Sequence, residues 1–305
     1  MRKVRSFATL GVSLMLTTLI AACGSTSTAA SPGTTTCSVD SSGFHLVNSG
    51  KLTVASDASF PPQEFKDPTT QQIVGSDVDL AKEMSKRLCL TPDVQNVSFD
   101  AIQTALTGPA LGQQRYDLSF SAWTITDNRK SAGDMIPYFQ AGESILVPTG
   151  NPKHIKVLTD LCGLNVAVQT ATNEETEIDN VNGGYDGKGG NPTALNLPGG
   201  ACEKNPVKPL MYVLQTDVIQ QLVNGRADAA YQDSPVTDYF LGLNTGKLDR
   251  GPTTVAASPE GIFVRKDNSP LENALIKALG DMRADGTYKK ILDKWHVTSD
   301  AFPAL

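Results

Sequence analysis

The sequence has little of what the recognition of nucleic acid, phosphate groups or metal ions requires. Its lysines and arginines form no cluster, and 26 of them stand against 32 acidic residues, so the formal net charge is −6. This balance argues against nucleic acid or an anionic membrane surface as a partner. Neither a glycine-rich phosphate loop nor a Ser-His-Asp set occurs, and the three histidines match no metal-ligand spacing. We therefore expect no metal, no cofactor and no catalytic residues.

Long apolar runs are also scarce. The run over residues 7–22 is too short for a membrane-spanning helix. It follows a basic start, MRKVR, and ends in LIAAC, where small residues directly precede Cys23. This pattern is typical of a bacterial lipobox, so we predict a lipoprotein signal peptide over residues 1–22 and a lipid on Cys23. The protein would then be extracytoplasmic and anchored to the cell membrane; an ordinary secretory signal with a chance cysteine is the alternative.

Cysteine is rare, with five residues in the whole chain. If Cys23 carries a lipid, the remaining cysteines form an even set in an oxidising compartment, where disulfides are the rule. Their order in the sequence suggests the pairs Cys37–Cys89 and Cys162–Cys202, although four cysteines permit other pairings. The second bridge would tie back the base of a glycine-rich segment.

Beyond the signal, strand-like and helix-like segments alternate. A Ser/Thr/Gly/Pro tract at 24–36 cannot build a core, so 23–50 is expected to hold the lipidated cysteine and a flexible tether. A helix is expected to begin with Ser76 as its cap, and residues 179–206, rich in Gly, Asn and Pro, are expected to form a surface excursion. The expected strands, from Lys51 onward, are KLTVAS, DLSFSAW, SILVP, LNVAVQ, DAAYQD and GIFVRK. This alternation predicts an α/β fold with mostly parallel strands.

Polar residues follow three of the expected strands. Ligands of α/β sheets bind beyond the carboxyl ends of the strands, where the sequence places Ser121–Thr124, Gln169–Thr172 and Asp233. Arg129, a little further on, offers a planar fork of donors suited to a carboxylate. Thr172 is suited to an anion nest at a helix start, and Asp233 to an ammonium group. Each has an ordinary alternative, a surface ion pair for Arg129 and a helix cap for the other two, but together they suit a zwitterion.

Six separated segments resemble, in order, the signature segments of a known family. They are KLTVASDASFPPQEF, IVGSDVDLAKEMSKRL, RYDLSFSAWTITDNR, LCGLNVAVQTAT, NGRADAAYQDSP and KALGDMRADGTYKKILDKWHV. They look like the extracellular solute-binding proteins of polar amino-acid ABC importers, the bacterial family 3 solute-binding lipoproteins. The resemblance implies a two-lobed, periplasmic-binding-protein-like fold of type II with two strand crossovers as its hinge. Lobe one would comprise 51–140 plus 256–305, and lobe two 141–255 with the insertion at 179–206.

The same resemblance assigns roles around the head group of an amino acid. Arg129 matches the arginine that grips the α-carboxylate, and Thr172 matches the threonine that joins it from the second lobe. Asp233 matches the carboxylate that takes the α-ammonium. Ser121 and Thr124 match polar strand-end positions around the same head group.

The pocket for the ligand side chain is less well defined. Asp57, Phe60 and Phe99 match positions that surround it, and Trp123 is either a wall of the pocket or packing beneath it. The two phenylalanines are suited to sandwich an extended side chain and Asp57 to neutralise a cation, so arginine or lysine fits, with glutamine as a neutral competitor. As alternatives, Asp57 caps a turn and the phenylalanines belong to the core. Departures from the family pattern, such as Gln63 where an aromatic residue is frequent, leave the ligand open.

The resemblance implies a lipid-anchored substrate-binding component of an amino-acid ABC importer. Its partners would be a polar L-amino acid, with basic ones among the candidates, and a membrane permease, and we expect a monomer that is not an enzyme. Two alternatives use the same scaffold. One is an enzyme such as a cyclohexadienyl dehydratase, which would need a general acid in the cleft, and the other is a detached amino-acid sensor.

Overall fold

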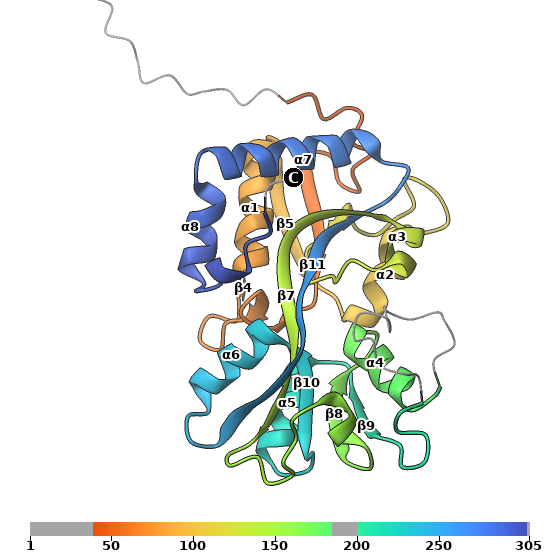
Figure 1. Ribbon diagram of the computed structural model, residues 1–305. Helices are drawn as coiled ribbons and strands as arrows, with labels where there is room; N and C mark the ends of the chain where they lie inside the picture. Colours follow the sequence, from red (N-terminus) through yellow and green to blue (C-terminus); the bar gives the residue numbers. More distant parts are fainter. Residues whose placement is uncertain (1–38, 185–199, 304–305) are drawn as a thin grey trace, which may run out of the picture. The chain divides into compact units, whose positions relative to one another are not determined.

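The computed structural model describes residues 39–184 and 200–303 (Figure 1). They belong to one compact unit, Cys37–Leu305. The expected signal peptide, Cys23 and Cys37 lie outside the described residues. No helix within the described ranges is both long and apolar enough to cross a membrane.

A mixed eight-stranded sheet runs through this unit, in the order β5-β1-β6-β11-β7-β10-β8-β9. Its outer pairs, β1–β5, β1–β6, β8–β10 and β8–β9, are parallel. The pairs at its centre, β6–β11, β7–β11 and β7–β10, are antiparallel. The strands are Thr91–Asn96 (β5), Lys51–Ser56 (β1), Leu118–Ser119 (β6), Leu248–Val264 (β11), Asp134–Pro148 (β7), Ala229–Asp233 (β10), Asn165–Gln169 (β8) and Lys208–Tyr212 (β9). A second, three-stranded sheet consists of Ser59–Phe60 (β2), Glu64–Lys66 (β3) and Ile73–Val74 (β4).

Helices cover the two ends of the large sheet (Figure 1). They are Ser76–Arg87 (α1), Phe99–Thr107 (α2), Asp127–Ala132 (α3), Asn173–Val181 (α4), Gln215–Val223 (α5), Ser234–Leu243 (α6), Ser269–Ala284 (α7) and Thr287–Lys294 (α8), with 3₁₀ turns at Leu158–Leu161 and Thr298–Asp300. In Figure 1, α1, α7 and α8 lie with β5 and β1, whereas α4, α5 and α6 lie with β8, β9 and β10.

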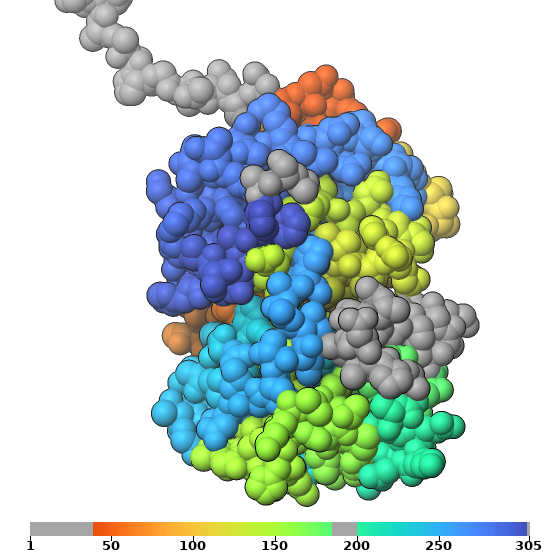
Figure 2. Space-filling model, viewed as in Figure 1, coloured from red at the N-terminus to blue at the C-terminus, as the bar shows by residue number. Residues whose placement is uncertain are grey.

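Two sets of buried side chains divide the unit into two lobes. In what we call the first lobe, residues of β1 and α1 pack with residues of α7 and α8 around Leu80, Met84 and Leu275. In the second lobe, Val166 and Val168 of β8 and Tyr231 of β10 belong to a separate core. The long strands β7 and β11 pair with each other and run from one lobe into the other, and Figure 2 shows the face along which β11 passes. The two-lobed α/β fold of type II is thus confirmed.

Helix α1 shows how the sequence specifies one element and where our prediction was wrong. Leu80, Ala81 and Met84 recur at helical spacing and are fully buried against the first-lobe core. The residue before the helix is Gly75, with φ 137°, and Ser76 is the first helical residue instead of the cap. A Cβ at Gly75 would lie 2.0 Å from the backbone oxygen of Gln63. Only glycine fits here, and this close approach of two backbones cannot be read from the local pattern.

Two further expectations need correction. The expected strand DLSFSAW is ordered as a strand only at Leu118–Ser119, because Ala122 has a positive φ of 46° that turns the chain. The expected tether over 23–50 is too long. Phe44 is 4% exposed and packs into the first-lobe core, and its carbonyl oxygen accepts a hydrogen bond of 2.6 Å from Nδ2 of Asn268.

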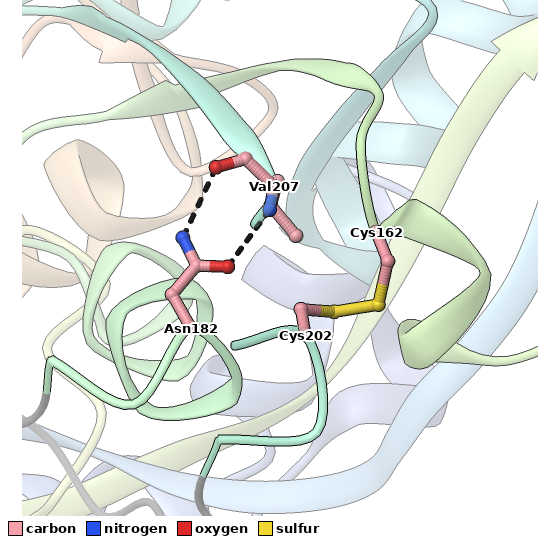
Figure 3. Close-up of a disulfide and its surroundings, with 4 residues drawn as sticks. All are labelled: Cys162, Asn182, Cys202 and Val207. Carbon is pink, nitrogen blue, oxygen red and sulfur yellow. Dashed lines mark hydrogen bonds between the residues drawn. A yellow bond between two sulfur atoms is a disulfide. The ribbon is translucent and has the colours of Figure 1, made fainter. Parts of the chain in front are cut away.

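The predicted disulfide Cys162–Cys202 is confirmed, with the two Cα atoms 5.2 Å apart (Figure 3). Beside it, the amide of Asn182 exchanges two hydrogen bonds with the backbone of Val207. Both contacts fix the chain on either side of the glycine-rich segment. Cys89 is disulfide-bonded as well, but its predicted partner lies outside the described residues, so that pairing stays a prediction.

Candidate ligand-binding site

A cavity lies between the lobes, at the carboxyl ends of β1, β8 and β10. It encloses about 300 Å³ of empty space, including the part open to solvent. Its walls are formed by Asp57, Phe60, Glu64, Phe99, Ser121, Ala122, Thr124, Arg129, Gln169, Thr172, Asn173, Glu174 and Asp233. The structure therefore brings together every residue predicted for the site except Trp123. That these residues bind a ligand stays a prediction.

Arg129 is held on the short helix α3 of the first lobe. Its backbone N–H donates to the Thr126 hydroxyl that caps this helix. Its guanidinium donates to the carbonyl oxygen of Thr124 at 2.8 Å and, across the cleft, to that of Ala171 at 3.2 Å. Burial lowers the pKa of Arg129 to about 10. The side chain therefore stays charged at neutral pH, and both of these hydrogen bonds go to backbone carbonyls rather than to a carboxylate.

Trp123 supports the site from behind instead of lining it. Its ring stacks on Phe99, with centroids 4.3 Å apart, and lies 4.9 Å from the guanidinium carbon of Arg129. Its indole N–H donates to the Ser119 hydroxyl at 2.9 Å. Stacking of this kind fixes both the ring of Phe99 and the cation beside it. Trp123 thus does not line this cavity, but it lines a neighbouring hollow together with Phe99, Arg129 and Thr172.

Ser121 connects two acids of the first lobe. Its hydroxyl donates to Oε1 of Glu64 at 2.9 Å and accepts a bond of 2.9 Å from the backbone N–H of Asp57. Burial raises the pKa of Asp57 to about 6 and that of Glu64 well above its usual value. Ser121 thus connects Asp57 and Glu64 at the first-lobe wall of the cavity.

The second lobe contributes the start of α4 and the end of β10. The Thr172 hydroxyl caps α4 by accepting from the N–H of Glu175, and it donates to the carbonyl oxygen of Gln169 at 2.9 Å. Burial raises the pKa of Glu174 to about 8, with Glu143 as the next cause, and raises that of Asp233 well above its usual value. These acids are thus poised to take up a cation, which would return them to the ionised form.

Five of the lining residues were not predicted as ligand contacts: Glu64, Ala122, Gln169, Asn173 and Glu174. Gln169 lies at a strand end that the sequence already marked as part of the binding edge. Asn173 and Glu174 follow the predicted contact Thr172 at a helix start, a signal that could have found them.

A second group of acids lies behind the start of α4. The Tyr231 hydroxyl of β10 contacts Oε2 of Glu143, at 2.8 Å, and a carboxylate oxygen of Glu177. It also lies 2.7 Å from the Thr254 hydroxyl on β11. Nδ2 of Asn173 donates to Glu143 at 2.6 Å. This group connects both long strands to the helix that begins at the cavity.

A two-lobed α/β fold with a polar cavity between the lobes is typical of proteins that bind a small solute by closing over it. The sequence matches the model of the bacterial extracellular solute-binding proteins, family 3, over residues 52–298. The chain belongs to this family, and the resemblance seen in the sequence is confirmed.

Known relatives are binding proteins of the same kind. The histidine-binding periplasmic protein of Salmonella typhimurium is 28% identical over 252 residues, which cover 80% of this chain and 87% of that protein. An ancestral arginine-binding protein, solved with bound arginine, gives a TM-score of 0.69 at 34% identity and covers 81% of this chain and 98% of its own. The ancestral amino acid-binding protein AncCDT-1, a precursor of cyclohexadienyl dehydratase, gives a TM-score of 0.65 at 32% identity. The match covers 81% of this chain and 95% of that protein's chain.

Proposed function

We propose that the protein binds a basic L-amino acid between its lobes and delivers it to a membrane permease, as the substrate-binding component of an ABC importer. The observation that carries this is the set of ionisable groups that line the cavity. Its described lining residues include four carboxylic acids and a single cation, Arg129. A basic amino acid brings one carboxylate and two cationic groups, which complement that set. Two of the three relatives reported above are named for histidine and arginine, which supports the same class of ligand.

In this proposal the head group lies between the lobes. Arg129 and the start of α4 at Thr172 hold the α-carboxylate, since the guanidinium and the helix N-terminus both favour an anion. Asp233 takes the α-ammonium. Because these groups come from both lobes, the ligand binds the closed form better than the open one and shifts the population toward closure.

The cationic end of the ligand side chain lies near Asp57 in the first lobe. Phe60 and Phe99 are each 7% exposed and flank this part of the cavity. They provide apolar walls for the methylene groups of an extended side chain. Ser121 and Thr124 remain the predicted polar contacts around the head group.

We further propose that lobe one comprises 51–140 plus 256–305, with the segment around Phe44 packed onto it, and lobe two 141–255. These boundaries fall inside β7 and β11, the strands that run through both lobes. The lipid on Cys23 would keep a monomeric protein at the outer side of the cell membrane, close to the permease. The family membership is consistent with this location.

The substitution Arg129→Ala tests the function. We expect it to weaken L-arginine binding at least about thirtyfold, because the ligand carboxylate would lose a buried charged partner. Isothermal titration calorimetry measures this, with Arg226→Ala, an exposed arginine after α5, as the matched control. Arg129→Lys keeps the positive charge but not the planar fork of donors, so its affinity for L-arginine should lie between those of the wild type and Arg129→Ala. Unchanged binding by folded Arg129→Ala protein would contradict the assignment.

Binding without turnover separates this function from an enzyme on the same scaffold. Purified protein incubated with prephenate or L-arogenate should leave both compounds unchanged, whereas consumption of either would favour the dehydratase alternative. An uptake measurement distinguishes an importer component from a sensor. If the protein serves import, deletion of its gene should abolish uptake of the bound amino acid.

A further inference from the structure

One side chain joins the two lobes at the bottom of the cavity. Gln169, the last residue of β8 in the second lobe, donates through Nε2 to Oδ2 of Asp57 in the first lobe, at 2.6 Å. The same nitrogen donates to the carbonyl oxygen of Val213 at 2.9 Å, which anchors the amide on the second lobe. Gln169 is 2% exposed and Asp57 is 1% exposed, so this hydrogen bond is shielded from water.

The other oxygen of Asp57 is differently placed. Oδ1 is buried and has no hydrogen-bond partner among the described residues, although Asp57 lines the cavity. Burial opposes the ionised form of Asp57 most strongly and raises its pKa, whereas Ser59, Gln169 and the backbone of Phe99 favour the ionised form. Glu64, the neighbouring acid on the same lobe, is hydrogen-bonded to Ser121 through Oε1, and its Oε2 is likewise buried without a partner among the described residues. Asp57 therefore has one oxygen fixed from the opposite lobe and one without a partner.

We propose that Gln169 is a specificity-determining residue: from the second lobe it orients and helps to ionise Asp57, whose Oδ1 then binds the cationic end of the ligand side chain. The inference rests on the proposed function. Because the amide of Gln169 is neutral, the negative charge of Asp57 remains beside the cavity. A lysine in place of Gln169 would cancel that charge. Closure of the lobes thereby becomes coupled to the charge of the ligand side chain as well as to its head group.

A structural role alone would have a different signature. If Gln169 only fixed β8 to the segment at Val213, its loss would weaken every ligand equally. If it acts through Asp57, its loss affects cationic side chains selectively, and only while the carboxylate of Asp57 is present. A double-mutant cycle with Asp57 separates these cases.

The experiment compares L-arginine with L-citrulline, which has nearly the same shape but an uncharged side-chain end. Calorimetry at pH 7.5 is applied to the wild type, Gln169→Met, Asp57→Asn and the double variant. We expect Gln169→Met to weaken L-arginine binding about tenfold or more and L-citrulline binding by less than about threefold, in line with the loss of a charge-assisted contact. In the Asp57→Asn background the Gln169→Met change should alter L-arginine binding by less than about twofold.

Controls keep the outcomes distinct. Gln220→Met, at an exposed glutamine of α5, should change neither affinity. If Gln169→Met fails to fold, as judged by its melting curve, Gln169→Asn serves instead, since its shorter side chain cannot reach both partners. Equal weakening of the two ligands, no weakening, or the same loss in the Asp57→Asn background would overturn the inference alone. A wild type that binds no amino acid would overturn the proposed function and the inference with it.

Discussion

The Tyr231 hydroxyl lies between the buried carboxyl groups of Glu143 and Glu177. Two carboxylates this close cannot both remain ionised away from water. Burial, and next the charge of Glu143, raise the pKa of Glu177 to about 11. The folded protein therefore keeps a proton on this pair at neutral pH. The unfolded chain releases that proton once the pH exceeds the ordinary glutamate pKa of 4.5.

Stability should accordingly fall as the pH rises above that ordinary value, because unfolding releases the proton. The effect of this one site is at most about 1.4 kcal/mol per pH unit. Gln in place of Glu177 is neutral at every pH and removes the effect. We expect Glu177→Gln to lose less stability than the wild type between pH 5.5 and pH 8.5, as measured by urea unfolding.

The control for this prediction is Glu203→Gln, at an exposed glutamate, which should retain the pH dependence of the wild type. The same dependence in Glu177→Gln would show that the pair holds no proton. A difference confined to the Glu177 variant would locate the proton beside the long strands.

Single residues also show what the sequence can predict about a site. Arg129, Thr172 and Asp233 could be placed together because each follows a strand of an α/β sheet. Glu174 was not predicted, although its place two residues after Thr172 at the start of α4 was a signal for it. The position of Trp123 could not be decided either, because stacking on Phe99 depends on residues far apart in the chain.

At the scale of elements, the strands and helices with strong periodicity were predicted and the connecting geometry was not. The strands β8 and β10 fall within the predicted strands LNVAVQ and DAAYQD. The short β6 was predicted too long, because the positive φ of Ala122 carries no sequence signal. The apolar residues in a run such as SFSAW are typical of a buried strand, although a turn interrupts this one.

The disulfide Cys162–Cys202 closes a loop with a sequence separation of 40 residues. A loop of this length corresponds to about 4 kcal/mol of stabilisation through the unfolded state. Replacing both cysteines with serine should therefore lower the melting temperature markedly, by more than about 5 °C. Differential scanning calorimetry measures this change.

Asn182→Ala provides the comparison, since it removes only two hydrogen bonds at the same base. Asn182→Ala should lower the free energy of unfolding by less than the loss of the disulfide does, by about 1 to 3 kcal/mol. A double-serine variant that melts no lower than Asn182→Ala would contradict the importance of the crosslink.

At the scale of the whole molecule, β7 and β11 are the link between the lobes. Their pairing changes register at several points, including the stretch between Val255 and Ser258. Gly142 of β7 faces this stretch, where an added Cβ would lie 2.6 Å from the backbone oxygen of Val255. A side chain here would push the two strands apart without touching the cavity.

We expect Gly142→Ala to weaken the binding of L-arginine and of L-citrulline by the same factor, about two- to thirtyfold. The substitution acts on closure of the lobes and does not contact either ligand. Calorimetry measures both affinities. Gly280→Ala on α7, where a Cβ would meet nothing within 4 Å, should leave them unchanged. A change for one ligand only would place the effect in the site instead of the crossover.

The first-lobe core is built from both ends of the chain, since Leu52 and Leu80 pack in one cluster with Leu275 and Leu292. The cores of the second lobe need only residues between Ile145 and Leu248. A chain that emerges N-terminus first thus exposes a complete second lobe while the first still lacks α7 and α8. The lobe that begins the sequence is the last that can finish folding, and its apolar strands need protection from aggregation until then.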